Sequence, residues 1–561
     1  MAQTAVDSDV SERVFRMAES WDYIIVGAGS AGCVMAERLS VDANVRVLLL
    51  EAGGNNDTTL VHMPKGFGKL VLDPKHSWHF PIEQPRRAGD PAQEVWIRGR
   101  GLGGSSAING MIWIRGQAAD YDEWQRLGAT GWGWATMREA FRAIEDHELG
   151  DDGVRGIGGP VRVSTGKYRY PLTESLIAAG EQMGLQRRED LNREDNEGVG
   201  YYAHNICNGR RQSAAVAFLQ PARSRRNLVI KTDVQVEHIE FDAEKRATAV
   251  IAREGKTAVR FQTRGEIILC AGALSTPHLL QLSGIGPGDV LQRAGVPVLV
   301  DRRDVGRRMR DHLGLAVPYR LRNSPGINKE LQGIGLVRNV FRYFLRHDGP
   351  MATGPFEVGA FVRTHDAVTR ANAQLFMGGL TFARGDDNFP VPLAAIEREP
   401  GMTLYAQLLR LTSEGTIALS SPDPYRLPTI TPNWLHTDED CRSAVALVRY
   451  MRRYMSQPAL APFVERELFP GPTRQSDAEL LEDFRRFSLC GTHAVASCRM
   501  GSDPDAVTDP DLRVRGVQNL RIVDCSVMPA TVSGNTNAPA IALAWAAAQR
   551  IRSAARQSLV A

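Results

Sequence analysis

The chain has 561 residues, 67 basic against 64 acidic side chains, and a formal net charge of +3. Two or more domains are expected at this length, and the near balance of charge gives no electrostatic case for binding nucleic acid or a membrane surface. No apolar run reaches the length of a membrane-spanning helix. Seven scattered cysteines without metal-ligand spacing, and a polar start without a secretory leader, predict reduced thiols, no metal and a cytoplasmic location.

A strand–turn–helix–strand pattern between Tyr23 and Glu51 dominates the N-terminal part. The apolar run Tyr23–Val26 predicts a buried parallel strand, Val34–Leu39 has helical spacing, and Val45–Leu50 predicts a second strand. Before this pattern, residues 10–17 have the spacing of a short surface helix.

The turn after the first strand reads G-A-G-S-A-G, which has the G-x-G-x-x-G spacing of a dinucleotide-binding fold. Gly27 permits the tight turn, Gly29 lets the backbone approach a pyrophosphate, and Gly32 lets helix and strand pack closely. The pyrophosphate would lie at the helix N-terminus, where N–H groups and the helix dipole favour an anion. Glu51 can accept hydrogen bonds from an adenosine ribose and disfavours a 2′-phosphate, which argues against NADP. The motif alone does not separate NAD from FAD.

A second glycine-rich stretch runs from Arg98 to Gly110, with the sequence R-G-R-G-L-G-G-S-S-A-I-N-G. Four glycines and two serines within eight of its residues would expose backbone donors to the phosphates and ring of a cofactor. The alternative is a plain glycine loop.

Together the two stretches resemble the signatures of the glucose–methanol–choline oxidoreductase family, which comprises FAD-dependent alcohol oxidases and dehydrogenases. The segment Gly272–Gly286, which follows the apolar strand-like Glu266–Ala271, resembles a second signature of that family. The resemblance covers nearly the whole chain after residue 20.

The resemblance implies an α/β fold (α+β overall), with a Rossmann-type FAD-binding domain and a discontinuous substrate domain on an antiparallel sheet flanked by helices. After a tail of residues 1–19, the FAD-binding domain would comprise 20–165, 221–316 and 485–561, and the substrate domain 166–220 and 317–484. Alternation in Thr403–Leu409 and Gly415–Leu419 predicts strands of that sheet, Asn227–Val234 a strand and turn of the nucleotide domain, and Asp438–Met455 a helix. The residues that the resemblance assigns to FAD are Gly27, Gly29, Ser30, Ala31, Gly32, Glu51, Ala52, Arg100, Gly103, Gly104, Ser105, Asn109, Gly110, Met111, Ile112, Val234, Ala271, Asp524, Asn535 and Thr536.

The resemblance also implies the catalytic pair, His493 and Asn537. An imidazole suits removal of the hydroxyl proton because its unperturbed pKa lies near neutrality, while an amide can hold the hydroxyl without competing for its proton. Asn535 is the rival to Asn537 for the second role, and Asn537 is favoured. In some relatives a histidine just before the residue matching Asn109 bonds FAD covalently. Ile108 stands there in this chain, so FAD is expected to bind non-covalently.

The resulting hypothesis is FAD-dependent oxidation of a non-sugar primary alcohol, aliphatic or aryl, to the aldehyde. Electrons would pass to oxygen, a quinone or a carrier, and a dehydrogenase is favoured over an oxidase. The alternatives are a choline-type substrate, a non-redox lyase or flavin photoenzyme on the same scaffold, and a flavoprotein without turnover. The apolar segment 391–396 favours a neutral substrate, and a cation-binding role for Glu357 is weighed against a structural one, which is favoured. The sequence leaves the oligomeric state open.

Overall fold

The computed structural model describes residues 20–83, 94–382 and 396–560. The helix expected over 10–17, and the segment 391–396 apart from Ile396, therefore lie outside the described residues. No described helix combines the length and the apolar character that crossing a bilayer requires.

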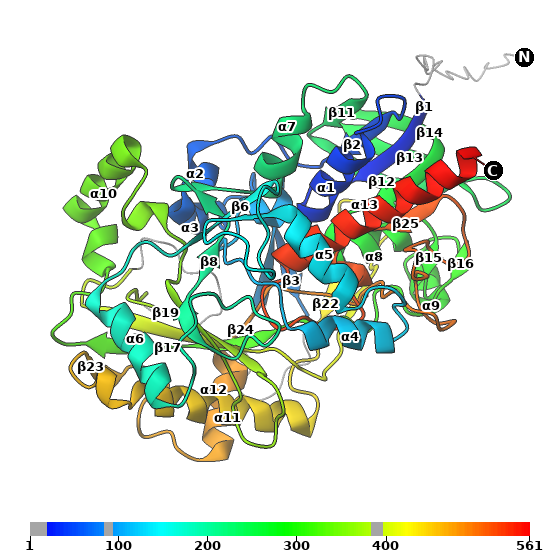
Figure 1. Cartoon of the computed structure of the whole chain (residues 1–561). Coiled ribbons are helices and arrows are strands. Elements are labelled where there is room, and N and C mark those ends of the chain that lie inside the picture. The colour runs from blue at the N-terminus through cyan, green and yellow to red at the C-terminus, as the bar shows by residue number, and fades with distance from the viewer. Residues whose placement is uncertain (1–19, 84–93, 383–395, 561) are drawn as a thin grey trace, which may run out of the picture.

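Within the described residues, a mixed sheet of seven strands forms the half of the molecule that contains β1 and the C-terminal helix α13 (Figure 1). Its strands run in the order β11-β2-β1-β14-β13-β12, with β25 also paired to β14. The pairs β11·β2, β2·β1, β1·β14 and β14·β25 are parallel, whereas β12 and β13 form an antiparallel extension. Its strands are β1 (Ser20–Val26), β2 (Val47–Leu50), β11 (Leu228–Lys231), β12 (Val234–Phe241), β13 (Ala247–Glu254), β14 (Thr257–Leu269) and β25 (Leu520–Ile522).

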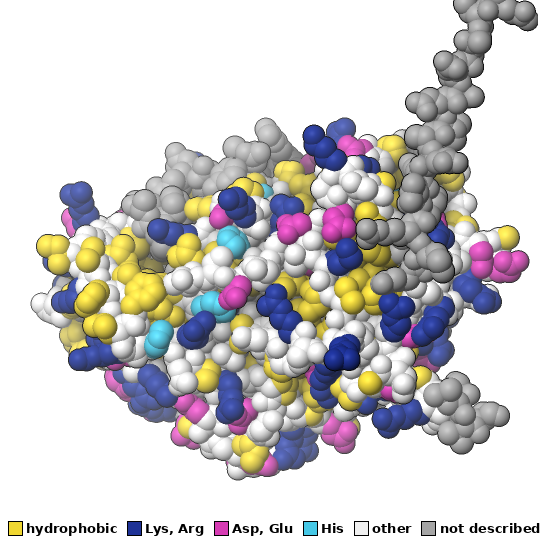
Figure 2. All heavy atoms as spheres, turned by 90° about the horizontal axis from the view of Figure 1, so that it is seen from above, with side chains coloured by type: hydrophobic (Ala, Val, Ile, Leu, Met, Phe, Trp, Pro, Cys, Tyr) yellow, Lys and Arg dark blue, Asp and Glu magenta, His cyan; other side chains and the backbone are white. Residues whose placement is uncertain are grey.

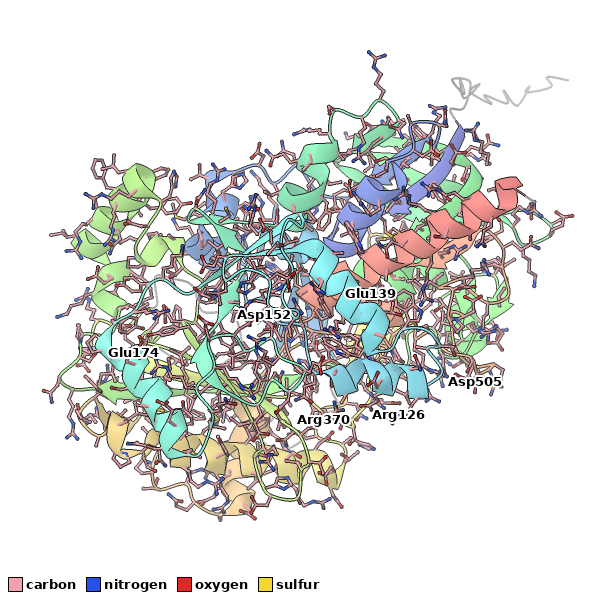
Figure 3. All side chains as sticks on the ribbon, viewed as in Figure 1. Arg126, Glu139, Asp152, Glu174, Arg370 and Asp505 are labelled. Atoms are coloured by element: carbon pink, nitrogen blue, oxygen red, sulfur yellow. The ribbon has the colours of Figure 1, made fainter. Side chains whose placement is uncertain are left out.

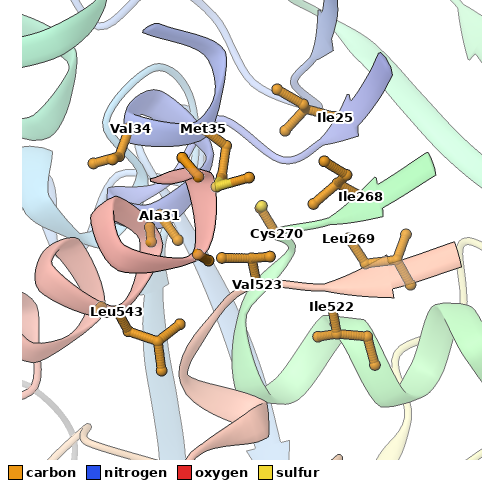
Figure 4. Packing of buried hydrophobic residues seen from close by; sticks show 14 of the residues in the cluster. Ile25, Ala31, Val34, Met35, Ile268, Leu269, Cys270, Ile522, Val523 and Leu543 are labelled. Carbon is orange, nitrogen blue, oxygen red and sulfur yellow. The ribbon is translucent and has the colours of Figure 1, made fainter. Parts of the chain in front are cut away.

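The central strands of this sheet are apolar and buried on both faces, since successive residues such as Ile24 and Ile25 are both fully buried. Ile25, Ile268 and Ile522 are buried in one cluster with Val34 of α1 (Ser30–Leu39) and Leu543 of α13 (Asn537–Val560) (Figure 4). Helix α13 packs against both α1 and α5 (Trp134–Ile144). The start of α1 is thereby fixed at the carboxyl end of β1, where dinucleotide folds bind their cofactor.

A second, antiparallel sheet forms the other half, in the order β23-β17-β20-β19-β18-β7 with β24 also paired to β17. One face packs on α6 (Pro171–Gln182), α11 (Asp438–Met455) and α12 (Asp477–Phe487). Its strands are β7 (Gly198–Tyr201), β17 (Leu313–Leu321), β18 (Val358–Val362), β19 (Ala373–Gly378), β20 (Gly401–Leu408), β23 (Val464–Glu467) and β24 (Ser488–Cys490).

Strand alternation decides what this second sheet presents on each face. In β20, Met402, Leu404, Ala406 and Leu408 join the core beneath the helices, whereas the residues between them, 403, 405 and 407, face a cavity. One face of this sheet is therefore an apolar packing surface, and the other face lines the cavity.

The remaining strands and helices connect or cover the two sheets. They are α2 (Thr59–His62), α3 (Phe67–Leu70), α4 (Ala118–Arg126), α7 (Gln220–Ala222), α8 (Gly272–Leu282), α9 (Gly288–Arg293), α10 (Gly333–Arg346), β3 (Ser77–Ile82), β4 (Glu94–Gly99), β5 (Glu145–His147), β6 (Val161–Thr165), β8 (Ala203–His204), β9 (Ile206–Cys207), β10 (Arg210–Arg211), β15 (Ile285–Gly286), β16 (Val300–Asp301), β21 (Thr416–Ala418) and β22 (Thr429–Thr431).

The fold class predicted from sequence is confirmed, and the helix expected at Asp438–Met455 has those bounds. The strand expected within Gly415–Leu419 exists as β21, but it pairs with β22 in a separate four-stranded sheet with β3 and β4. The domain division stays a prediction. Its boundary at 316/317 falls inside β17 and the one at 484/485 inside α12, because both elements run on without a break.

Candidate active site

A cavity of about 800 Å³ extends from the glycine turns of the first sheet to the front of the second. Most of the residues predicted for the cofactor or for catalysis line it. They are Gly27, Gly29, Ser30, Ala31, Glu51, Ala52, Gly104, Ser105, Asn109, Gly110, Met111, Ile112, Val234, Ala271, Asp524, Asn535, Thr536, Asn537 and His493. The fold thus brings segments from four distant parts of the chain to one hollow.

The start of α1 fits a cofactor pyrophosphate. Gly29 is the N-cap residue and has no side chain to bond the first N–H groups of the helix. A Cβ at Gly29 would meet no other atom closer than the Cys270 carbonyl oxygen at 4.0 Å, so the space in front of this backbone is open. Open, uncapped N–H groups at the N-terminus of a ten-residue helix form an anion site.

Glu51 holds three loops around that anion site. Its carboxylate accepts hydrogen bonds from the backbone N–H of Ala28 at 2.8 Å and from those of Gly53 and Gly101 at 2.9 Å. Burial raises the pKa of Glu51, while the three N–H donors act to lower it. The carboxylate also borders the cavity, which leaves it accessible to a ribose hydroxyl.

Three residues predicted to contact FAD do not line the cavity. Gly32 is packed against the first turn, where an added Cβ would lie 1.9 Å from the Gly27 carbonyl oxygen. Gly103 has φ 91° and donates its N–H to the Ala28 carbonyl at 2.8 Å. Arg100 stacks over the Trp78 ring and donates to the Ala52 carbonyl at 3.3 Å. All three residues therefore stabilise the binding loops without facing the cavity.

His493 lies where the cavity meets the second sheet, just after β24. Its backbone N–H donates to Asp311 Oδ1 at 2.8 Å, and Asp311 also accepts from the N–H of His312 at 2.7 Å. One carboxylate therefore fixes the backbone of both histidines. Burial raises the pKa of Asp311 to about 6, although Arg98, 3.7 Å from its Oδ2, acts to lower it.

The ring of His493 belongs to a chain of side-chain hydrogen bonds. His493 Nδ1 lies 3.0 Å from His312 Nδ1, and His493 Nε2 lies 3.2 Å from Asn535 Nδ2. On the far side Gln374 Nε2 donates to Asn535 Oδ1 at 3.1 Å, and Gln407 Nε2 donates to Gln374 Oε1 at 2.9 Å. The two glutamines thus orient the Asn535 amide with its N–H₂ group toward His493.

This chain assigns the tautomers of both histidines. Because Asn535 turns its N–H₂ group to His493 Nε2, that nitrogen is the acceptor, and the proton of the neutral ring is on Nδ1. His312 Nδ1 is then the acceptor and His493 Nδ1–H the donor. The lone pair of His493 Nε2 consequently points at the Asn535 amide, into the cavity.

Burial keeps both imidazoles neutral. It lowers the pKa of His312 to about 4. The pKa of His493 is lowered well below 6.5, first by burial and then by His312 and Arg98. A neutral imidazole whose lone pair faces a cavity can act as a proton acceptor.

The sequence analysis favoured Asn537 over Asn535 as the residue that holds the hydroxyl, whereas Asn535 is the one that contacts His493 in the structure. Asn537 is the first residue of α13, and its Oδ1 accepts a hydrogen bond from Ser30 Oγ at 2.8 Å, at the start of α1. Asn535 lies two residues before the start of the helix and follows Gly534, whose φ is 141°, and its Nδ2 lies 3.2 Å from His493 Nε2. Both asparagines line the cavity, but at different places.

Sequence reasoning missed several residues of the site. The sequence analysis assigns no role to His312, which directly follows Asp311. Gln374 and Gln407 carry no signal of their own in the sequence. An aromatic group formed by Phe356, Phe376 and Tyr405, with ring centroids 5.3 to 6.4 Å apart, also lines the cavity.

Glu357 is outside the cavity lining. It is buried, its Oε2 accepts a hydrogen bond from the Tyr170 hydroxyl at 3.2 Å, and its Oε1 lies 4.0 Å from Lys65 Nζ. These contacts support the structural role that the sequence analysis favoured, since a buried carboxylate beside a buried ammonium is already paired.

Gly29 and Gly32 provide a matched test of cofactor binding against folding. Gly32→Ala should destabilise the apoprotein by roughly 2 kcal/mol, because its Cβ overlaps the Gly27 carbonyl. Gly29→Ala, with φ −75° and open space, should keep the stability of the apoprotein but retain at least about tenfold less FAD. Urea unfolding of the apoproteins and FAD titration separate the two effects. Equal FAD affinity in Gly29→Ala and wild type would contradict this view of the turn.

Comparison with known proteins agrees with this geometry. Sequence models of the family described as GMC oxidoreductase match residues 21–314 with their N-terminal part and 412–544 with their C-terminal part. Human mitochondrial choline dehydrogenase is 37% identical over 544 residues, which cover 95% of this chain and 90% of the relative. An alcohol dehydrogenase [acceptor] of Pseudomonas putida is 37% identical over 535 residues, which cover 95% of both proteins.

A solved structure carries the same fold. Pyridoxine 4-oxidase from Mesorbium loti superposes with a TM-score of 0.85 at 32% identity, over 95% of this chain and 99% of that one. With the paired sheets, the glycine turns and the full-length matches, this chain belongs to the GMC oxidoreductase family.

Proposed function

We propose that this protein oxidises a non-sugar primary alcohol to the aldehyde, with His493 as the group that takes the hydroxyl proton. Membership of the family makes it an FAD-dependent oxidoreductase that acts on CH–OH groups. The observation that carries the finer proposal is the pairing of the His493 lone pair with the Asn535 amide at one end of the cavity.

The two groups offer a hydroxyl what it needs to lose its proton. An alcohol oxygen that lies in the cavity beside both atoms, and replaces their direct hydrogen bond, would accept a hydrogen bond from Asn535 Nδ2–H and donate its own proton to His493 Nε2. His312 keeps His493 in the accepting tautomer by taking the hydrogen bond from His493 Nδ1–H. FAD, when bound, supplies the acceptor for the hydride that leaves the alcohol carbon.

The lining of the cavity supports a neutral substrate. The two carboxylates among its described residues are Glu51 and Asp524, and backbone N–H groups bind both. Near His493 the walls include Phe356, Phe376 and Tyr405. Such walls bury alkyl or aryl groups, although an aromatic wall can also hold a quaternary ammonium group, so choline is the rival substrate.

Dehydrogenase activity is favoured over oxidase activity, because both curated relatives described above are named dehydrogenases. The acceptor (oxygen, a quinone or a carrier) and the cytoplasmic location stay predictions.

Denaturation should release the FAD completely. Ile108 lines the cavity at the position where some relatives attach FAD through histidine, and an alkyl side chain cannot form that bond. After acid precipitation, the supernatant should contain all the yellow colour and the pellet none. Flavin that remains with the washed polypeptide would reveal another point of attachment.

Replacing His493 by alanine should leave FAD bound but slow anaerobic flavin reduction by alcohol about 10²-fold or more. The lowered pKa of His493 also fixes the pH profile of the wild type. Its base stays neutral as the pH falls through 6.5, so the rate should hold between about pH 8 and pH 6 and decline only in more acidic solution. In the alanine variant the rate should instead rise with pH, as the alcohol itself begins to ionise. A wild-type rate that halves near pH 6.5 would argue against a buried neutral base.

Replacing Asn535 and replacing Asn537 should have different effects on flavin reduction and on FAD retention. Asn535→Ala should slow flavin reduction roughly tenfold with FAD retained, since it loses one hydrogen bond to the hydroxyl. Asn537→Ala should chiefly weaken FAD retention, because it breaks the contact with Ser30 at the start of α1. Stopped-flow reduction of the FAD-loaded variants, and FAD content after gel filtration, measure the two properties. The opposite pattern would restore Asn537 as the partner of His493.

A further inference from the structure

Helix α10 (Gly333–Arg346) turns its apolar face to the solvent. Ile334, Val337, Phe341, Phe344 and Leu345 are 55 to 89% exposed. Their spacing of three, four, three and one residues gives a single stripe along the helix. A surface helix normally directs such a stripe into the core, and contiguous exposed apolar side chains mark an interaction site.

The opposite face of α10 is fixed to the protein. Asn339 and Tyr343 are each 2% exposed, and Asn339 Nδ2 donates to the Glu330 carbonyl at 2.9 Å. Tyr343 packs in a buried cluster with Met351 and Ile327. Because Asn339 and Tyr343 occupy the inward face, the helix cannot rotate to bury its stripe.

A row of arginines borders the stripe on one flank. Arg338, Arg342 and Arg346 follow one another at intervals of four residues and are exposed, and Arg338 pairs with Glu330 and Arg342 with Asp348, each at 2.6 Å. Within residues 329–348, four basic side chains (Lys329, Arg338, Arg342 and Arg346) stand against two acidic ones (Glu330 and Asp348), for a local net charge of +2. In Figure 2 hydrophobic side chains bordered by Lys and Arg gather at the left edge of the molecule, where α10 lies in Figure 1.

The inward side of α10 packs on the surroundings of the cavity. Val340 and Tyr343 of α10 belong to one apolar cluster with Leu380 and Phe382, and the latter two also line the cavity. A surface bound by α10 would therefore lie beside the part of the protein where this cluster separates the cavity from solvent.

We propose that α10 docks on an anionic lipid surface, with the apolar stripe inserted among the acyl chains and the arginines on the headgroups. An exposed apolar stripe beside a basic flank is the pattern of interfacial helices, and the arginine row is complementary to anionic lipid. The size argues against a second copy of the chain, since five side chains on one helix fall short of the roughly 20–30 residues a side of a stable protein interface.

Flotation of the FAD-loaded protein with lipid vesicles tests the proposal. The protein should float with vesicles of phosphatidylcholine and phosphatidylglycerol, less with phosphatidylcholine alone, and less again as salt is raised. Phe341→Glu should lower the partition coefficient at least about tenfold, because it places a charge in the inserted stripe. Arg346→Gln should lower it about fivefold on anionic vesicles only.

Each variant has a matched control elsewhere on the surface. Ile157→Glu changes a side chain that is 58% exposed, against 66% for Phe341, and should bind vesicles like the wild type. Arg126→Gln removes one positive charge from α4, well away from α10 in Figure 3, and should also leave binding unchanged. Melting temperature and FAD content should match the wild type in all four variants, which excludes unfolding as the cause.

Two results would overturn the proposal. One is absence of flotation with anionic vesicles, and the other is equal loss of binding in Phe341→Glu and Ile157→Glu. If the wild type instead sediments as a dimer that Phe341→Glu dissociates, and no vesicle binding occurs, the stripe is an interface between copies.

Discussion

The candidate site depends on one chain of buried hydrogen bonds, from Gln407 through Gln374, Asn535 and His493 to His312. Each hydrogen bond fixes the orientation of the next side chain. The orientation of the Gln407 amide on β20 therefore determines the tautomer of His493, which follows β24. Buried polar networks are costly unless every member has a partner. Here the network ends at His312, whose Nδ1 accepts the hydrogen bond from His493 Nδ1–H and so keeps His493 Nε2 unprotonated.

A second polar group organises the cofactor end by similar means. Glu51 accepts N–H groups from the first glycine turn, from the loop after β2 and from the second glycine stretch. The same carboxylate that could bind a ribose thus closes the loops around it. This explains why an acid at the end of β2 and glycines some fifty residues later occur together. The glycines allow these loops to approach one another closely, and the carboxylate holds the loops in place.

The sequence was sufficient for the fold class, the Rossmann turn and the presence of His493 in the site, because these depend on local periodicity and on long motifs. It did not decide which residues meet, where that depends on the tertiary structure. Asn535 and Asn537 stand two residues apart, and only the start of α13 between them decides which amide meets His493. His312 could not be assigned from its own segment, since its partner is 181 residues away. For α10 the amphipathic spacing is readable, but which face points outward is set by the burial of Asn339 and Tyr343. The formal net charge of +3 for the whole chain gives no indication of the arginine row on α10.

The alternation along β19 and β20 has a consequence for how such a protein can diverge. Side chains at 376, 403, 405 and 407 line the cavity, while those between them anchor the sheet to α6, α11 and α12. Exchanging the first set alters what the chamber accepts without touching the packing that keeps the sheet folded. Recognition and stability are therefore encoded at interleaved positions of the same strands. Mutation and selection can retune one while the other is conserved.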